Sequence, residues 1–201
     1  RAIATGQNVY NGLSSLFQHV NHISDFKKLK IPFFCVATEL ETGNSKVFDN
    51  GYLPAAVRAS ASLPTLLDPM EVDDVAYIDG GISENFPVEE MKNKGVDIII
   101  GVNVQGRLEE KENINSVVDV LNQIVNYQMY GRDEEKLKIV NLHIEPKVRE
   151  FGVTSFGDVN EIVDLGEAAA QDFEEAFLKI ANQQNRTTQS QKISLKKIKR
   201  S

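Results

Sequence analysis

Short apolar runs rich in β-branched residues alternate along this chain with longer stretches of helical period. The short runs predict strands, and they cover residues 31–40, 46–48, 75–78, 97–104 and 137–144. The longer stretches place apolar residues on one face and predict helices, at residues 9–20, 114–125 and 162–180, the last with Asp158 as a candidate cap. Strands separated by helices indicate an α/β fold with a mainly parallel sheet and flanking helices.

The order of these elements is unusual at the beginning of the chain. A doubly wound sheet normally starts with a strand and a glycine-rich turn, whereas this chain opens with a loop and the helical stretch 9–20. We therefore expect the N-terminal part of the domain to be missing.

The composition is that of an ordinary globular domain, with 41% hydrophobic and 25% charged residues among 201. The longest apolar runs are far shorter than the roughly 20 residues that a membrane-spanning helix needs. A net charge of -7 argues against nucleic acid as a partner. The single Cys35 has no partner for a disulfide or a cysteine metal site, and its apolar run predicts a buried small hydrophobic residue.

The last residues differ in charge from the rest of the chain. Residues 184–201 hold six basic residues and no acidic one, so residues 1–183 carry a net charge of -13. Residues 185–191 have the composition of a polar linker, and residues 193–198 alternate like the first strand of a further module. We therefore divide the chain into a domain at 1–183 and a tail at 184–201, which is either such a junction or a solvated basic end.

The residues that carry chemistry surround a single aspartate. Asp79 follows the apolar run 75–78 and precedes Gly80 and Gly81. Two glycines allow a sharp turn, so we expect one of them to adopt a backbone conformation that disfavours other residues, with the carboxylate at the rim of the sheet. Because ligand sites of open α/β sheets lie at the carboxyl ends of strands, this place suits a catalytic group. Taken alone, however, Asp-Gly-Gly is a common turn.

The wider pattern around Asp-Gly-Gly is more specific. Ala-Ser-Ala-Ser-Leu-Pro at 59–64 precedes the strand, and Asn85 and Pro87 follow the glycines at a helix start. This stretch resembles the patatin-like phospholipase family, in which Ala-Ser-x-x-Leu/Ile-Pro, a strand, Asp-Gly-Gly and Asn-x-Pro occur in that order. The likeness covers roughly residues 5–180. It implies a patatin-like three-layer architecture, of which this chain would be the rear portion, and hydrolysis of an ester bond in a lipid. It also implies that the missing N-terminal part supplies central strands, whose loss would leave unpaired edges on the strands at 31–40 and 97–104. Such edges recruit a companion segment or a second copy of the chain.

By that resemblance, Asp79 is the base of a serine-aspartate dyad that deprotonates the nucleophilic serine in place of a histidine. Gly80, Gly81 and Asn85 would form the active-site loop. Arg58 is interpreted as a structural residue that anchors its helix to the sheet. Nucleophile, base and oxyanion donors suffice for this chemistry, so the resemblance implies no cofactor.

The rest of the family's catalytic machinery is not found in the sequence. The glycine-rich oxyanion loop and the Gly-x-Ser-x-Gly elbow of the family precede Asp-Gly-Gly, and neither pattern occurs in residues 1–201. The nearest matches, at 12–16 and 43–47, both lack the second glycine. No catalytic serine is therefore assigned, and we expect the nucleophile to lie outside this chain and residues 1–201 alone to be inactive.

Other candidate residues have simpler explanations. His19 and His22 lie on a polar stretch and His143 lies on a predicted strand. None of the three has a cysteine or carboxylate at the spacing of a zinc site, so no metal is predicted. Asp73 and Asp74 precede the strand of Asp79 and are interpreted as a solvated turn rather than a catalytic carboxylate pair.

Two functions of different classes stay open. The first is a serine hydrolase acting on a phospholipid or another lipid ester, with a membrane surface as a further partner. The alternative is a non-catalytic patatin-fold module that binds lipid or protein, and an unrelated α/β domain with a coincidental turn is a third possibility. The resemblance points most closely to bacterial proteins in which the patatin domain precedes a periplasmic module and an outer-membrane barrel. It implies the cell envelope as the location, with the cytoplasm as the alternative.

Overall fold

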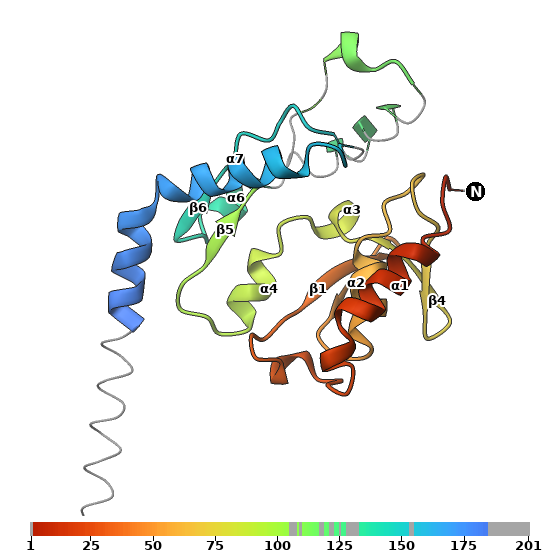
Figure 1. The fold of residues 1–201 in the computed structure, drawn as a ribbon, viewed down its shortest axis with the longest axis horizontal. Coiled ribbons are helices and arrows are strands. Elements are labelled where there is room, and N and C mark those ends of the chain that lie inside the picture. Colours follow the sequence, from red (N-terminus) through yellow and green to blue (C-terminus); the bar gives the residue numbers. More distant parts are fainter. Residues whose placement is uncertain are drawn as a thin grey trace, which may run out of the picture. The chain divides into compact units, whose positions relative to one another are not determined.

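A computed structural model (Figure 1) describes residues 2–104, 108, 110–116, 119–120, 123–124, 126–127, 133–152 and 155–184. The chain divides into two compact units. The first unit contains residues 1–96 and 107–139, and the second contains residues 97–106 and 140–201. None of the described helices has both the length and the apolar character that a membrane-spanning segment needs.

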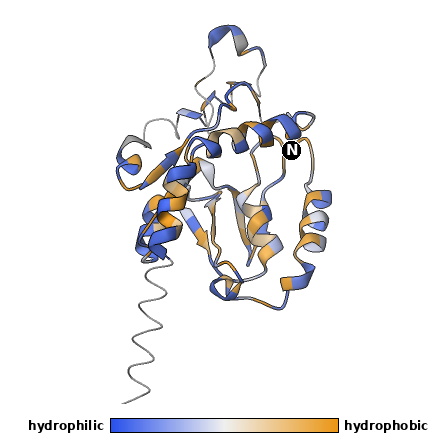
Figure 2. Ribbon diagram, turned by 60° about the vertical axis from the view of Figure 1, so that its left-hand side comes forward, coloured by the Kyte–Doolittle hydropathy of each residue, from blue (hydrophilic) through white to orange (hydrophobic). Residues whose placement is uncertain are grey.

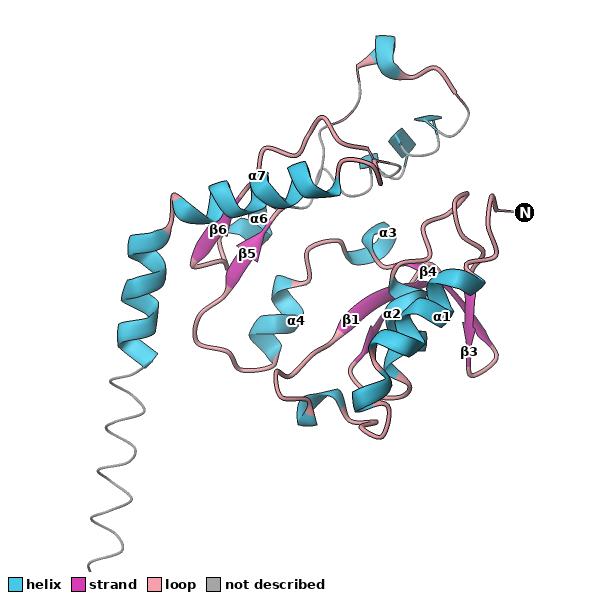
Figure 3. Ribbon diagram, viewed as in Figure 1, coloured by secondary structure: helices cyan, strands magenta, loops and turns pink. Residues whose placement is uncertain are grey.

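The first unit is built on a sheet of four strands in the order β2-β1-β4-β3 (Figure 3). The strands are β1 (Cys35–Glu39), β2 (Ser45–Phe48), β3 (Met70–Val72) and β4 (Val75–Asp79). All three pairings are antiparallel. In the central pairing, Ala37 of β1 lies opposite Asp79 of β4.

The α/β class predicted from the sequence is confirmed, but a mainly parallel sheet is only partly confirmed. Two of the pairings in the first unit are hairpins, and a short connection can join only antiparallel strands. The β1–β2 hairpin has Gly43 at a φ of 73° in its turn, a backbone conformation that glycine adopts without strain. The β3–β4 turn has Asp73 and Asp74 at φ values of 52° and 62°, which is the backbone of a two-residue hairpin turn.

Strand β1 also differs from its prediction in extent and in pairing. It begins at Cys35 rather than at Ile31, since Ile31 is 79% exposed and Pro32 has no N–H to donate to a sheet. The predicted unpaired edge on this strand is wrong, because β1 pairs with β2 on one side and with β4 on the other.

The first unit also contains helices. They are α1 (Gln7–Leu16), α2 (Leu53–Ser60), α3 (Gly81–Glu84), α4 (Val88–Asn93) and α6 (Asp133–Leu137), with 3-10 turns at Gln18–Val20, Phe26–Lys28 and Lys111–Asn113. Helices α1 and α2 are neighbours, and α2 packs against β1, β3 and β4 (Figure 1). The predicted helix at 9–20 thus appears as α1 followed by a 3-10 turn.

The core of the first unit lies between α2 and the sheet. Its buried members come from α2, β1, β2, β4 and the 3-10 turn Phe26–Lys28, and they are Phe26, Ala37, Phe48, Leu53, Ala56, Ala59 and Tyr77. The rings of Phe48 and Tyr77 meet edge to face with centroids 5.1 Å apart, a favoured aromatic geometry. Hydrophobic and hydrophilic residues alternate along the helices (Figure 2), which is typical of amphipathic helices.

The second unit contains two parallel strands, β5 (Ile100–Val102) and β6 (Leu142–Ile144), and helix α7 (Val159–Gln171). Residues 174–184 are also helical, so the predicted helix at 162–180 is interrupted after Gln171. Asp158 immediately precedes α7 as predicted, but its side chain makes no capping hydrogen bond. The predicted helix at 114–125 lies partly outside the described residues, and the tail at 185–201 lies wholly outside them.

Candidate functional site

Asp79 is the last residue of β4, where the sequence places it. Its backbone is held on both sides. The N–H donates to the carbonyl of Ser62 at 3.0 Å, and the carbonyl accepts from the Thr38 hydroxyl at 2.8 Å. Because β4 is antiparallel to β1, the carboxyl ends of these two strands do not lie together, and neighbouring side chains define the site instead.

The carboxylate of Asp79 has one engaged oxygen and one unengaged oxygen. Oδ1 accepts from the backbone N–H of Gly81 at 2.7 Å. Within the described part of the chain, Oδ2 has no hydrogen-bond partner. Burial raises the pKa of Asp79, and the hydrogen bond from Gly81 lowers it without cancelling the effect of burial. A carboxylate with a raised pKa and one unengaged oxygen is a competent proton acceptor.

Gly80 and Gly81 do not adopt the unusual backbone that the sequence predicts. Gly80 has a φ of -65° and a ψ of -26°, and Gly81 is the first residue of α3. That prediction is wrong because the chain leaves the strand by entering a right-handed helical turn. Gly80 is required for a different reason, since a Cβ atom there would lie 2.0 Å from the carbonyl oxygen of Val36 in the neighbouring chain segment.

The predicted active-site loop is therefore a short helix. Asn85 is the residue that ends α3, and its side chain is exposed. The preceding Glu84 accepts from the N–H of Phe86 at 3.2 Å and forms an ion pair with Lys136 of α6, whose side chain is only 10% exposed. The ion pair between Lys136 and Glu84 connects α6 to the segment that follows Asp79, although the two residues are 52 positions apart.

Arg58 is buried, with 2% of its surface exposed. The prediction that it anchors α2 to the sheet is wrong. Its guanidinium donates to the carbonyls of Thr5 at 3.2 Å and Asp68 at 2.9 Å, and to the hydroxyl of Ser62. Burial lowers the pKa of Arg58, while the charge of Asp68 opposes that shift. Arg58 thus ties α2 to the N-terminal segment and to the loop whose Ser62 carbonyl accepts from Asp79.

The sequence did not predict the hydrogen-bonded hydroxyl groups of Thr38 and Ser83 beside Asp79. Thr38 is 1% exposed on β1, and its oxygen lies 2.8 Å from the hydroxyl of Ser83. The only sequence signal was a polar residue within the apolar run 31–40. Lys136 carried no signal at all, because its partner lies 52 positions away.

The serines nearest to the elbow pattern do not contact the candidate base. Ser14 lies in α1 and Ser45 begins β2, and neither hydrogen bonds to Asp79. In the part of the chain that the structure describes, no serine hydroxyl contacts the carboxylate of Asp79. The site therefore shows a candidate base without a nucleophile bonded to it among these residues.

The remaining candidates have structural places. Asp73 and Asp74 are exposed in the β3–β4 turn, as predicted. His19 and His22 are exposed, and His143 lies on β6 with a buried Nε2. Among the described residues there is no group of three or more His, Cys, Asp or Glu side chains that could hold a metal.

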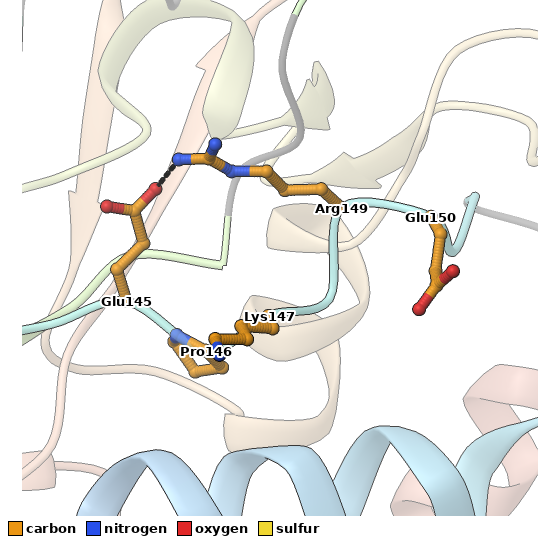
Figure 4. A pocket seen from close by; sticks show the side chains of 5 residues that line it. All are labelled: Glu145, Pro146, Lys147, Arg149 and Glu150. Carbon is orange, nitrogen blue, oxygen red and sulfur yellow. Dashed lines mark hydrogen bonds and ion pairs between the residues drawn. The ribbon is translucent and has the colours of Figure 1, made fainter. Parts of the chain in front are cut away.

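A surface hollow lies in the second unit, after β6. It has a volume of about 460 Å³ and is lined by Glu145, Pro146, Lys147, Arg149 and Glu150, with an ion pair between Glu145 and Arg149 (Figure 4). Its lining is charged with both signs, so it does not have the apolar character of an acyl-chain site. Asp79 is not among its lining residues.

Fold and site together define an α/β protein with a candidate general base at the end of a strand. Residues 1–92, which include Asp79, match the family model described as patatin-like phospholipase. The resemblance to the patatin-like phospholipase family, stated from the Asp-Gly-Gly motif, is thereby confirmed for this part of the chain.

Known relatives agree with that assignment. The chain is 25% identical to the lysophospholipase NTE1 of Candida albicans over 194 residues, which is 84% of this chain and 14% of that protein. It is 39% identical over 80 residues to an uncharacterized NTE family protein of Mycobacterium tuberculosis, covering 40% of this chain and 22% of the relative. It is 33% identical over 111 residues to the NTE1 lysophospholipase of Meyerozyma guilliermondii, which is 55% of this chain and 7% of that protein. The chain thus spans less than a quarter of each of these relatives.

Proposed function

We propose that this chain is part of a lipid acyl hydrolase and supplies Asp79 as the base of a serine-aspartate dyad. The observation that carries the proposal is the carboxylate itself, which is partly buried, is oriented by Gly81 through Oδ1 and presents Oδ2 without a partner among the described residues. The names of the fungal relatives support a lysophospholipid as the substrate class.

In the proposed reaction, a serine outside residues 1–201 attacks the carbonyl carbon of the acyl ester. Asp79 accepts the hydroxyl proton through Oδ2 while the new Ser–acyl bond forms. The ester C–O bond then breaks, and the leaving alcohol takes the proton back from Asp79. Water hydrolyses the acyl-serine in the same way, with Asp79 again accepting and returning a proton.

The raised pKa of Asp79 has a consequence for the pH dependence of this reaction. The base acts only when it is ionised, so turnover falls as the pH drops through its pKa. Burial raises the pKa of Asp79 above the ordinary value of 3.8, and the acid limb of kcat/KM is therefore expected above that value.

Substitution of Asp79 tests the proposal. In the intact protein, Asp79→Asn keeps the shape of the side chain and the bond from Gly81, but an amide cannot accept the serine proton. Hydrolysis of lysophosphatidylcholine should fall about 100-fold to 10,000-fold, the usual cost of losing a general base. Asp73→Asn, in the exposed β3–β4 turn, is the matched control and should keep wild-type turnover. Wild-type turnover in Asp79→Asn would exclude the dyad.

The alternative function is a non-catalytic module that binds lipid. It is favoured by the absence of Gly-x-Ser-x-Gly from residues 1–201. The same assay separates the two functions. The hydrolase proposal requires turnover in the intact protein and none in residues 1–201 alone, whereas the binding module requires lysophospholipid binding without turnover in either.

Location and assembly also stay predictions. Placement in a bacterial cell envelope, and a membrane surface as a partner, rest on the family resemblance. Self-association or pairing with a companion segment is supported by β5, which pairs only with β6 among the described residues and exposes Val102 by 50%. Light scattering on residues 1–201 tests the assembly prediction.

A further inference from the structure

Thr38 is a deeply buried polar side chain next to the candidate base. It lies in β1 between the core residue Ala37 and Glu39, and it is 1% exposed. A buried hydroxyl needs partners for its one proton and two lone pairs, because an unpaired buried polar group is costly. Among the described residues, the partners of the Thr38 hydroxyl lie in the segment that begins with Asp79.

The bonding of this hydroxyl is complete and directional. Its proton goes to the carbonyl oxygen of Asp79 at 2.8 Å, since a carbonyl can only accept. Its oxygen accepts from the backbone N–H of Ser83 at 3.2 Å. With its single proton committed to Asp79, Thr38 must also be the acceptor in the 2.8 Å contact with the Ser83 hydroxyl.

These bonds act on the two ends of the Asp79–Ser83 turn. The bond to the Asp79 carbonyl orients the peptide plane that follows the catalytic residue, and the bonds from Ser83 hold the first turn of α3 against β1. The Gly81 N–H that orients the carboxylate lies between these two anchor points. One side chain on the neighbouring strand therefore holds both ends of the turn that carries the carboxylate.

We propose that Thr38 is a positioning residue that keeps the Asp79 carboxylate in its reactive orientation through the Asp79 carbonyl and Ser83. This inference rests on the proposed role of Asp79 as the base. Thr38 touches neither the substrate nor the reacting atoms. Its effect on rate comes through geometry, because a misplacement of a catalytic group by about 1 Å costs on the order of 100-fold in rate.

The experiment compares Thr38→Val with Thr38→Ser in the intact protein. Valine keeps the shape and removes the hydroxyl, so kcat for lysophosphatidylcholine should fall roughly 10-fold to 100-fold with KM unchanged. Loosening of the turn should also expose Asp79 to water and move the acid limb of the pH profile toward lower pH. Serine keeps the hydroxyl and should restore kcat and the pH profile. Thr42→Val, in the exposed β1–β2 turn, is the matched control and should behave as wild type.

Each outcome decides for or against the positioning role. A Thr38→Val enzyme with wild-type kcat and an unmoved pH profile overturns it, and so does a Thr38→Ser enzyme as impaired as Thr38→Val. If Thr38→Val does not fold, Thr38→Cys replaces it, since a thiol is a weaker donor of similar size. An intermediate kcat supports the role and a wild-type kcat overturns it.

Asp79→Asn in the same assay separates this inference from the proposed function. Wild-type turnover in Asp79→Asn defeats the dyad itself. If Asp79→Asn is inactive while Thr38→Val keeps wild-type kcat and an unmoved pH profile, the dyad stands and only the positioning role fails.

Discussion

Gly80→Ala probes the close approach between the residue after Asp79 and strand β1. A Cβ atom at this position would lie 2.0 Å from the carbonyl oxygen of Val36, 2.6 Å from its carbonyl carbon and 3.2 Å from the nitrogen of Ala37. All three are backbone atoms, so no side chain can rotate away. Gly80 is also held on its other side by the bond from its N–H to the carbonyl of Ser60 at 3.2 Å.

The cost of this substitution follows from these contacts. Overpacking of a well-packed site costs about 1–3 kcal/mol, and loss of the bond to Ser60 adds about 1 kcal/mol. We expect a decrease of about 3 kcal/mol in the free energy of unfolding. For a chain of this size, that corresponds to a Tm lower by roughly 6–12 °C. Displacement of the Asp79–Gly81 turn should also reduce turnover in the intact protein.

Thermal melts followed by circular dichroism measure this effect, with Gly12→Ala as the matched control. Gly12 lies inside α1, and no atom lies within 4 Å of a Cβ placed there. Alanine is the better helix former by about 1 kcal/mol, so Gly12→Ala should raise Tm. If Gly80→Ala melted at or above the wild-type temperature with unchanged turnover, the close-approach argument would be refuted.

Two further predictions concern Asp79 and Cys35. Burial raises the pKa of Asp79 above the ordinary value of 3.8, so the wild-type fold loses stability as the pH rises through the folded-state pKa. Asp79→Asn removes this loss and should therefore raise Tm at pH 7. Below about pH 3.8 the wild-type carboxyl is protonated in both states, and the Tm advantage of Asp79→Asn should disappear. A Tm difference that is the same at both pH values would contradict this linkage. Burial also raises the pKa of the Cys35 thiol to about 11, although a hydrogen bond with Ser60 opposes it. Iodoacetamide at pH 8 should therefore alkylate Cys35 far more slowly in the folded chain than in urea, and equal rates by mass spectrometry would be inconsistent with a protected thiol.

The local elements of the fold could be predicted because their signals lie within a few residues. The turn at 42–44 contains the glycine that its backbone requires, and the apolar run 75–78 becomes β4 and ends at Asp79. The direction of strand pairing could not be predicted in the same way. Thr38 and Asp79 are 41 positions apart. The residue pattern within one strand specifies neither which distant strand it pairs with nor the direction of that pairing.

The sequence by itself determined the candidate base, since the order of motifs around Asp79 is specific even where its single tripeptide is not. Only the tertiary structure decided what surrounds that carboxylate. Burial against β1 raises its pKa, the Val36 carbonyl excludes any side chain at residue 80, and Thr38 supplies the hydroxyl that orients the turn. These effects depend on distances between segments remote in sequence, and packing of β1 against β4 and α3 sets those distances.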